Sequence, residues 1–196
     1  MAKVTGPLFS VDARGKIGDS LVFMGWRGLK TVRSYVIPSN PQTEEQMRVR
    51  DNFSMAVSMW SNLTGQDQQA WRLLASGQPY SGFNDYVGRV KEQLDASNTW
   101  VDIKNVEVSD ITANSAVIEG TTNDDGDLLI RYGTTAGSYP NSITVTPTLG
   151  EDDVYTFSGQ LSDLRPDTTY YFTIETVSSG AIYGRTGTYT FSTATS

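Results

Sequence analysis

The sequence predicts two domains: a small α+β domain over residues 1–98 and an all-β sandwich over residues 102–196. Three observations support this division. Short apolar runs punctuated by Gly and Pro fill the first forty residues, and apolar residues then recur at helical spacing to about residue 94. From residue 103 the period changes to two, which is typical of strands.

The first forty residues predict a β-meander. The expected strands are residues 7–11, 21–24 and 31–37, and the expected turns are residues 12–16 and 25–28. Pro38 and Pro41 end the meander, because proline can neither continue a strand nor lie deep inside a helix. The segment around them is expected to act as a hinge.

Three short helices are expected next. Thr43 with Gln46, and then Thr64 with Asp67, place a hydroxyl three residues before an amide or acid, which is the pattern of a capping box. The apolar stripes of the three helices are Phe53, Ala56, Val57 and Trp60; Ala70, Trp71 and Leu74; and Phe83, Tyr86, Val87, Val90 and Leu94. These stripes predict either a core within one chain or a surface buried against a partner, since so small a unit buries little area alone.

Seven short strands are expected in the second half, separated by Gly, Asn, Asp and Pro. They are residues 103–108, 115–121, 128–132, 142–146, 154–161, 170–177 and 183–191. This number and spacing of strands predict a β-sandwich.

Composition excludes much chemistry. The chain has no His and no Cys, the usual general base near neutral pH and the main soft metal ligands. We therefore expect no disulfide, no cofactor and no enzymatic activity. No apolar run approaches the roughly 20 residues of a membrane span, and we expect no secretory signal.

Charge divides unevenly along the chain. Residues 1–100 hold eleven Lys and Arg against nine Asp and Glu, whereas residues 101–196 hold four against thirteen. The acidic second half argues against a nucleic-acid partner. In the first half Arg14, Lys16, Arg27, Lys30 and Arg33 form a basic stretch, which indicates either an acidic partner or a solvated face.

The second half carries the run Leu164-Arg165-Pro166-Asp167-Thr168-Thr169-Tyr170. This run resembles the tyrosine corner of fibronectin type III domains, an immunoglobulin-like sandwich, and the resemblance covers about 90 residues. It implies fold-defining roles for Leu164, Pro166, Thr168 and Tyr170, with the Tyr170 hydroxyl bonded back to the preceding turn. One departure is Gly120, which stands where many members carry a core tryptophan.

The first half carries Gly6-Pro7-Leu8-Phe9-Ser10, Trp26-Arg27-Gly28 and Val32-Arg33-Ser34-Tyr35-Val36-Ile37-Pro38. It is similar to the N-terminal part of small structural proteins of tailed bacteriophages and prophages. That resemblance implies a place in a virion rather than a mechanism.

Two acidic clusters are candidates for chemistry. Asp124, Asp125 and Asp127, or residues 151–153, could offer the carboxyl pair of a glycosidase or oxygen ligands to Ca²⁺. Both lie at expected turns, where Asp and Gly are the ordinary residues, and the first lacks the spacing of an EF-hand. A solvated turn is the simpler interpretation.

Aromatic residues give the remaining candidates. Tyr139, Tyr155 and Tyr183 fall at strand ends, where they could contact glycans or pack in the sandwich. Trp26 lies between two glycines at an expected hairpin tip, and such a ring either anchors a neighbour or folds back on its own helices. The candidate anchor set is Phe23, Trp26, Arg27, Lys30, Arg33 and Tyr35.

These features together predict a non-enzymatic virion structural protein of a tailed phage. The first domain is expected to anchor it as a head decoration, or at the neck or tail, and the second to be displayed. Expected partners are other virion proteins of the capsid, neck or tail, with several copies or a homo-oligomer on the particle. The alternative is a surface adhesion or carbohydrate-binding module, and weak contact with host glycans stays open.

Overall fold

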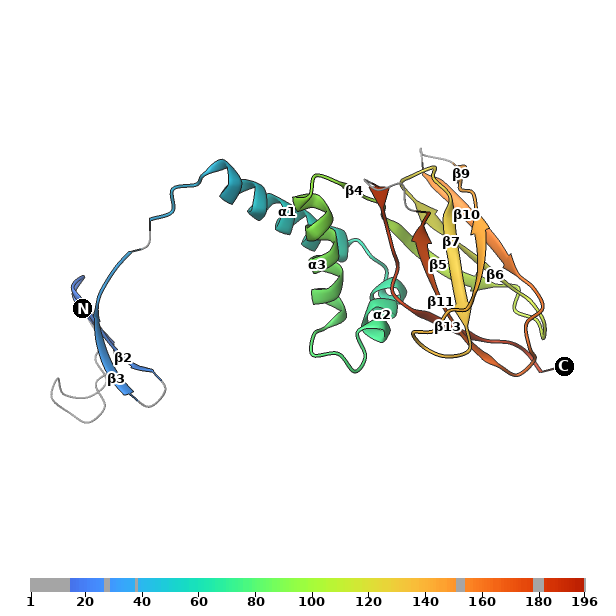
Figure 1. Cartoon of the computed structure of the whole chain (residues 1–196), viewed down its shortest axis with the longest axis horizontal. Coiled ribbons are helices and arrows are strands. Elements are labelled where there is room, and N and C mark those ends of the chain that lie inside the picture. Colours follow the sequence, from blue (N-terminus) through green and yellow to red (C-terminus); the bar gives the residue numbers. More distant parts are fainter. Residues whose placement is uncertain (1–14, 27–28, 38, 151–153, 178–181, 196) are drawn as a thin grey trace. The chain divides into compact units, whose positions relative to one another are not determined.

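The computed structural model describes residues 15–26, 29–37, 39–150, 154–177 and 182–195, and Figure 1 shows their elements. By their internal contacts residues 1–43 form one compact unit and residues 44–196 another. The helices thus belong with the sandwich and not with the meander. The expected division into domains of residues 1–98 and 102–196 stays a prediction.

The first unit is a three-stranded antiparallel sheet of β1 (Gly15–Ile17), β2 (Leu21–Trp26) and β3 (Leu29–Ser34), in that order. Two expectations were wrong here. β1 falls partly on the expected turn at 12–16, and Trp26 is not in the turn but ends β2, paired with Leu29 across a two-residue connection. Such short connections suit the twist of a hairpin. The strand expected at 7–11 lies outside the described residues.

Three helices open the second unit: α1 (Glu44–Ser61), α2 (Gly65–Leu74) and α3 (Gly82–Asp95). The expected capping box at α2 is confirmed. Thr64 Oγ1 accepts a hydrogen bond from the Asp67 amide at 3.1 Å, and the Thr64 amide donates to the Asp67 carboxylate at 3.3 Å. The Ser81 hydroxyl caps α3 by accepting from the Asn84 amide.

The sandwich consists of two four-stranded antiparallel sheets. One sheet has the order β5-β6-β10-β9 and the other the order β13-β11-β7-β8, which is the division of a fibronectin-like sandwich. Its strands are β5 (Ile103–Ser109), β6 (Ala116–Thr122), β7 (Leu128–Gly133), β8 (Asn141–Val145), β9 (Thr148–Leu149), β10 (Tyr155–Leu161), β11 (Thr169–Thr176) and β13 (Tyr189–Ser192). The predicted fold class is confirmed.

The last expected strand, residues 183–191, is interrupted. β12 (Ile182–Tyr183) pairs in parallel with β4 (Thr99–Trp100), and the chain rejoins the main sheet only at β13. Between them the backbone meets α2, where the Thr188 amide donates to the Ala70 carbonyl at 3.0 Å. A Cβ on Gly187 would lie 2.3 Å from backbone atoms of Ala70 and Trp71, so this approach requires glycine.

The sandwich core contains residues from both sheets, and within it Phe157 lies directly against Gly120. Gly120 and Phe157 are paired across β6 and β10, and a Cβ on Gly120 would lie 2.6 Å from the Phe157 ring. Phe157 is buried in this cluster. The absence of a side chain at position 120 therefore makes room for an aromatic ring supplied by the neighbouring strand.

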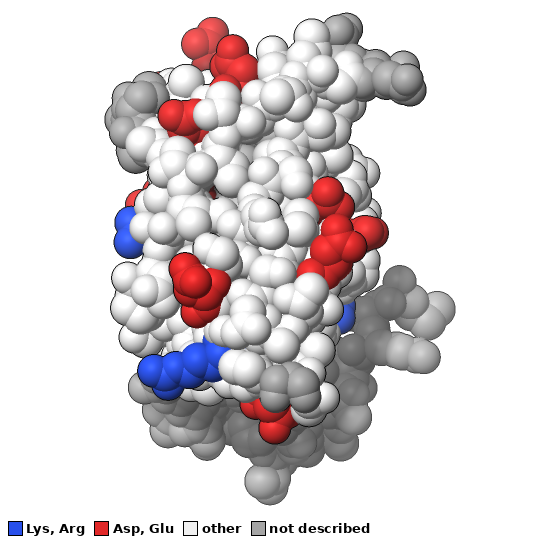
Figure 2. Space-filling model, turned by 90° about the vertical axis from the view of Figure 1, so that its right-hand side faces the viewer, with Lys and Arg blue, Asp and Glu red and all other residues white. Residues whose placement is uncertain are grey.

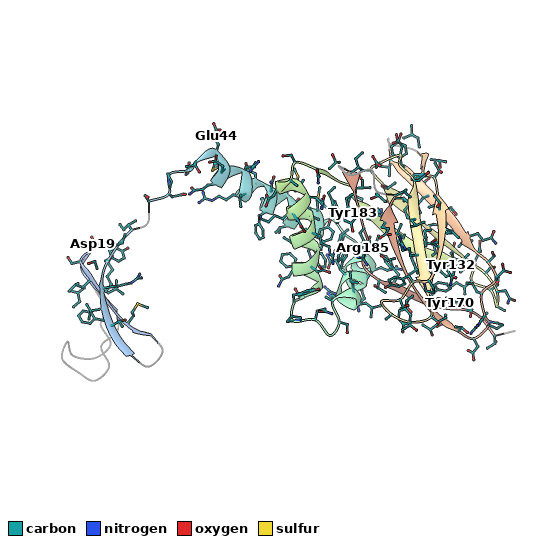
Figure 3. All side chains as sticks on the ribbon, viewed as in Figure 1. Asp19, Glu44, Tyr132, Tyr170, Tyr183 and Arg185 are labelled. Atoms are coloured by element: carbon teal, nitrogen blue, oxygen red, sulfur yellow. The ribbon has the colours of Figure 1, made fainter. Side chains whose placement is uncertain are left out.

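The turn between β10 and β11 has the geometry of a tyrosine corner. The Arg165 amide donates to the Tyr170 hydroxyl at 2.9 Å, and the Tyr170 ring stacks on Phe191 with centroids 5.7 Å apart. Thr168 Oγ1 donates to the Pro166 carbonyl, and Leu164 is buried in the sandwich core. Figure 3 shows Tyr170 beside Tyr132 on the neighbouring strand.

The helices are joined to the sandwich through the carboxylate of Asp67, which is 1% exposed. Asp67 Oδ1 accepts from the Tyr189 hydroxyl at 2.7 Å and the Val106 amide at 3.3 Å, and Oδ2 accepts from the Asn105 amide at 2.9 Å. Asn105 has a φ of 54° at an irregularity in β5, which turns these two amides toward α2. The buried charge is thereby fully hydrogen-bonded.

A second core of aromatic rings binds the three helices together and reaches β12. Tyr86 is at its centre, with ring centroids 5.2 Å from Trp71, 5.5 Å from Trp60 and 6.0 Å from Trp100. The Tyr86 hydroxyl is buried, and within the described residues it has no hydrogen-bond partner. Burial raises the pKa of Tyr86, because the charged form would lose its solvation.

We expect Tyr189→Phe to lower the free energy of unfolding at pH 7 by about 1.5–3 kcal/mol, as for a hydrogen bond to a charged group. Burial, and then the charge of Asp67, raise the pKa of Tyr189. The folded state therefore keeps a proton that the unfolded chain loses above about pH 10. The contribution of this proton to the free energy of unfolding is fully present below about pH 10 and is lost as the pH rises further.

Urea unfolding of both proteins between pH 7 and pH 11 checks this. The variant should lose less stability than the parent above pH 10. If the free energies of unfolding of the two proteins changed in parallel from pH 7 to pH 11, folding would not raise the pKa of Tyr189.

Gly120→Ala should destabilise the protein by about 1–3 kcal/mol, because the new methyl group overpacks the core against Phe157. Gly88→Ala is the matched control. Gly88 lies within α3 and a Cβ there meets no atom within 4 Å, so alanine should stabilise by up to about 1 kcal/mol. Chemical denaturation measures both. Equal effects of the two substitutions would contradict the close fit at position 120.

A pair of Tyr→Phe variants compares a bonded hydroxyl with an unbonded one. Tyr170→Phe should cost roughly 1 kcal/mol, because the Arg165 amide loses its acceptor. Tyr86→Phe should be neutral or stabilising, because it removes a buried hydroxyl without a partner. Thermal and urea unfolding give both values, and a larger loss for Tyr86→Phe would refute the assignment.

Candidate assembly interface

The described residues between positions 15 and 55 include three strands and the first half of α1 but contribute to no core. Among the described residues of this segment no side chain is buried; the first buried residue is Ala56. From Ala56 onward the chain contributes to two hydrophobic clusters. The segment nevertheless exposes a concentrated set of large apolar side chains: Leu21, Val32, Val36, Ile37, Met47, Val49, Phe53 and Met55. Isolated sheets and helix ends of this size are marginal in water, so this segment is suited to a partner.

The two faces of the three-stranded sheet differ in character. Register places Ile17, Leu21, Phe23 and Val32 on one face, where the positions of Lys30 and Ser34 also fall. Lys16, Val22 and Arg33 are paired across the other face, which also carries the positions of Met24, Trp26, Leu29 and Thr31. We call the first the arm face and the second the cationic face.

Contacts within the sheet orient Lys16. Its Nζ lies 2.7 Å from the Asp19 carboxylate and 3.7 Å from the centroid of the Tyr35 ring. The hydrogen bond with Asp19 raises the pKa of Lys16, which stays charged. Of the predicted anchor set, Phe23, Arg33 and Tyr35 lie in this unit. Trp26 and Lys30 are placed there only by their backbone, and Arg27 lies outside the described residues.

The first half of α1 continues the exposed apolar surface. Val49 and Phe53 lie on the same line along the helix as Ala56 and Trp60, yet Phe53 is 49% exposed although the stripe predicts burial. The cause is the length of α3, whose last residue, Asp95, accepts a hydrogen bond from the Asn52 side chain. The turns of α1 that precede Asn52 extend beyond the end of α3, and Figure 1 shows them projecting. We call Val49 and Phe53 the stem stripe.

The three tyrosines proposed for glycan contact lie on separate elements and are all half-buried. Tyr139 precedes β8 and its hydroxyl shares a hydrogen bond of 2.7 Å with Thr188. Tyr183 packs edge-on against Trp100 with centroids 5.8 Å apart, and Figure 3 shows it between the sandwich and the helices. Tyr155 starts β10, paired with Thr122 of β6. The structure does not bring the three rings together into one platform.

The acidic turn between β6 and β7 is held by its own hydrogen bonds. Asp124 Oδ2 accepts from the Gly126 amide at 3.2 Å, and Asp127 Oδ1 accepts from the Thr146 hydroxyl at 2.6 Å. Throughout the described ranges no three acidic side chains converge as metal ligands, so Asp124, Asp125 and Asp127 do not form such a group. Residues 151–153 lie outside those ranges.

One surface feature was missed by sequence reasoning. An open groove of about 520 Å³ runs along α3 and is lined by Tyr80, Asn84, Asp85, Gly88, Arg89 and Glu92. The Tyr80 ring is 43% exposed, and Arg89 Nε donates to Asp85 at 2.8 Å. In the sequence, the aromatic residue Tyr80 directly before the helix cap Ser81 is the signal that could have indicated this groove.

Comparison with known proteins found no matching family model and no matching curated protein. Solved structures do match. Astrotactin-2, described as a vertebrate-specific perforin-like membrane protein, is 16% identical with a TM-score of 0.40, covering 46% of this chain and 21% of that chain. The FN1-FN3 domains of chicken CNTN1 are 19% identical with a TM-score of 0.37, covering 50% of this chain and 31% of that one.

A single FN3 domain of human collagen XX is 20% identical, with a TM-score of 0.35, and covers 45% of this chain and 88% of that chain. The fibronectin-like assignment of the C-terminal part rests on its own strand order and tyrosine corner. None of the helices within the described ranges combines the length and apolar character that crossing a bilayer requires.

Proposed function

We propose that this chain is a non-enzymatic virion structural protein of a tailed phage. Its N-terminal segment anchors it to the particle, as a head decoration or at the neck or tail, and its sandwich is displayed. The partners are other virion proteins, and several copies occupy one particle.

The observation that carries this proposal is the coreless segment of residues 15–55. Its strands and its helix end expose large apolar side chains, whereas the rest of the chain has two buried cores. A segment of this kind gains stability when its apolar surface is covered in an assembly. The cationic face, with Lys16 and Arg33, suits an acidic docking surface.

The remaining part of the chain supports display. The Asp67 hydrogen bonds and the backbone contact at Gly187 hold the helices against the sandwich, so the two project as one body. Many such bodies on one particle would give avidity to weak individual contacts.

The alternative is a surface carbohydrate-binding or adhesion module. The specific observation in its favour is the groove along α3, where an exposed tyrosine lies beside amide and charged groups of the kind that bind sugars. Binding of a neutral oligosaccharide that disappears in Tyr80→Ala would favour this function over particle anchoring.

Trp26→Ala should lower occupancy of the particle several-fold while thermal unfolding of residues 44–196 is unchanged. The reason is that a large apolar anchor contributes most of its energy at a buried contact. Co-sedimentation of the full chain with particles that lack it gives the occupancy. Tyr80→Ala is the matched control, since it removes an exposed aromatic ring from the second unit. Equal occupancy of Trp26→Ala and parent would refute the anchor.

A further inference from the structure

The chain has two uncovered apolar surfaces of similar character, one in each unit. The arm face presents Leu21 and Val32, which are 40% and 54% exposed. The stem stripe presents Val49 and Phe53 where α3 has ended. A sheet face and a helix stripe are the two surfaces that pack together in α/β and α+β layers.

The two units carry opposite charge. Residues 1–43 hold six Lys and Arg against two Asp, a net +4, while residues 44–196 hold nine against twenty Asp and Glu, a net −11. Figure 2 shows acidic groups spread over the face in view, with few basic ones. The first unit of one copy is therefore attracted by the second unit of another, and this complementarity points to a second copy of the chain as the occupant.

The segment between the units has no regular structure at residues 35–37 and 39–43. Proline at positions 38 and 41 favours extended conformations at Ile37 and Asn40, whereas Gln42 has a left-handed φ of 51°. The oligomeric state of the full-length chain therefore distinguishes contact with a neighbour from contact within one chain.

We propose that the arm face of one copy packs on the stem stripe of a second copy, in a head-to-tail contact that joins copies into a ring or a chain. A contact between two different surfaces is heterologous and repeats until it closes. The inference rests on the proposed function, because it names one partner of the same N-terminal segment. The cationic face stays available for the particle.

Two substitutions test the contact in the full-length chain. Val32→Asp places a charge on the arm face, and Phe53→Asp places one on the stem stripe. Each should weaken self-association by about tenfold or more, because the contact would bury an unpaired charge. Thr31→Asp, on the opposite face of β3, and Met55→Asp are the matched controls. Met55 is 51% exposed and lies about 200° around α1 from Phe53.

Light scattering and sedimentation velocity give the mass of each protein, with circular dichroism to confirm folding. The parent and both controls should form oligomers, and each of the two variants should be monomeric. An equimolar mixture of the variants should give a dimer of one copy of each and nothing larger, because one intact arm face meets one intact stem stripe.

A parent that is monomeric at its highest soluble concentration would overturn the inference, as would a mixture that stays monomeric. Oligomers of unchanged mass in Val32→Asp or Phe53→Asp would do the same. Particle binding separates this failure from that of the proposed function. A monomeric parent that still co-sediments with particles leaves the anchoring role standing, whereas oligomers that do not bind particles leave only the self-association.

Discussion

The architecture of residues 44–196 depends on one buried carboxylate. Asp67 caps α2 through Thr64 and also receives hydrogen bonds from Asn105, Val106 and Tyr189 of the sandwich. A buried charge is tolerated only where such donors replace water, so the helix start, the irregularity in β5 and the position of β13 are mutually constrained. If any one of these donors is lost, the buried carboxylate of Asp67 is left with too few hydrogen bonds.

This arrangement also explains why the chain divides after Thr43. The helices share backbone and side-chain hydrogen bonds with the sandwich, and their aromatic core reaches Tyr183. Among the described residues of the three-stranded sheet no side chain is buried, and Leu21 and Val32 are exposed. A sheet of this size is marginal in water on its own.

Local signals in the sequence were reliable where one short motif determines the geometry. The Thr64 capping box and the Tyr170 corner each require only neighbouring residues, and both are formed. The second role of Asp67 was not predictable, because Asn105 and Tyr189 are distant in sequence and the positive φ of Asn105 has no distinctive signal. Phe157 could not be recognised as the partner of Gly120, since the register of β6 and β10 was unknown. Phe53 was expected to be buried because a stripe shows which side of a helix is apolar, but not how far the neighbouring helix extends.

The backbone contact at Gly187 limits how this sandwich can be exchanged. In many multidomain proteins such modules are joined by linkers and can be replaced singly. Here the backbone at Gly187 contacts the backbone of α2 directly, because glycine has no side chain, and β12 pairs with β4 next to the helices. A different fibronectin-like domain grafted at residue 102 would lack both fits. Recombination or engineering that keeps the fold must therefore transfer the region from α2 through β13 as one cassette.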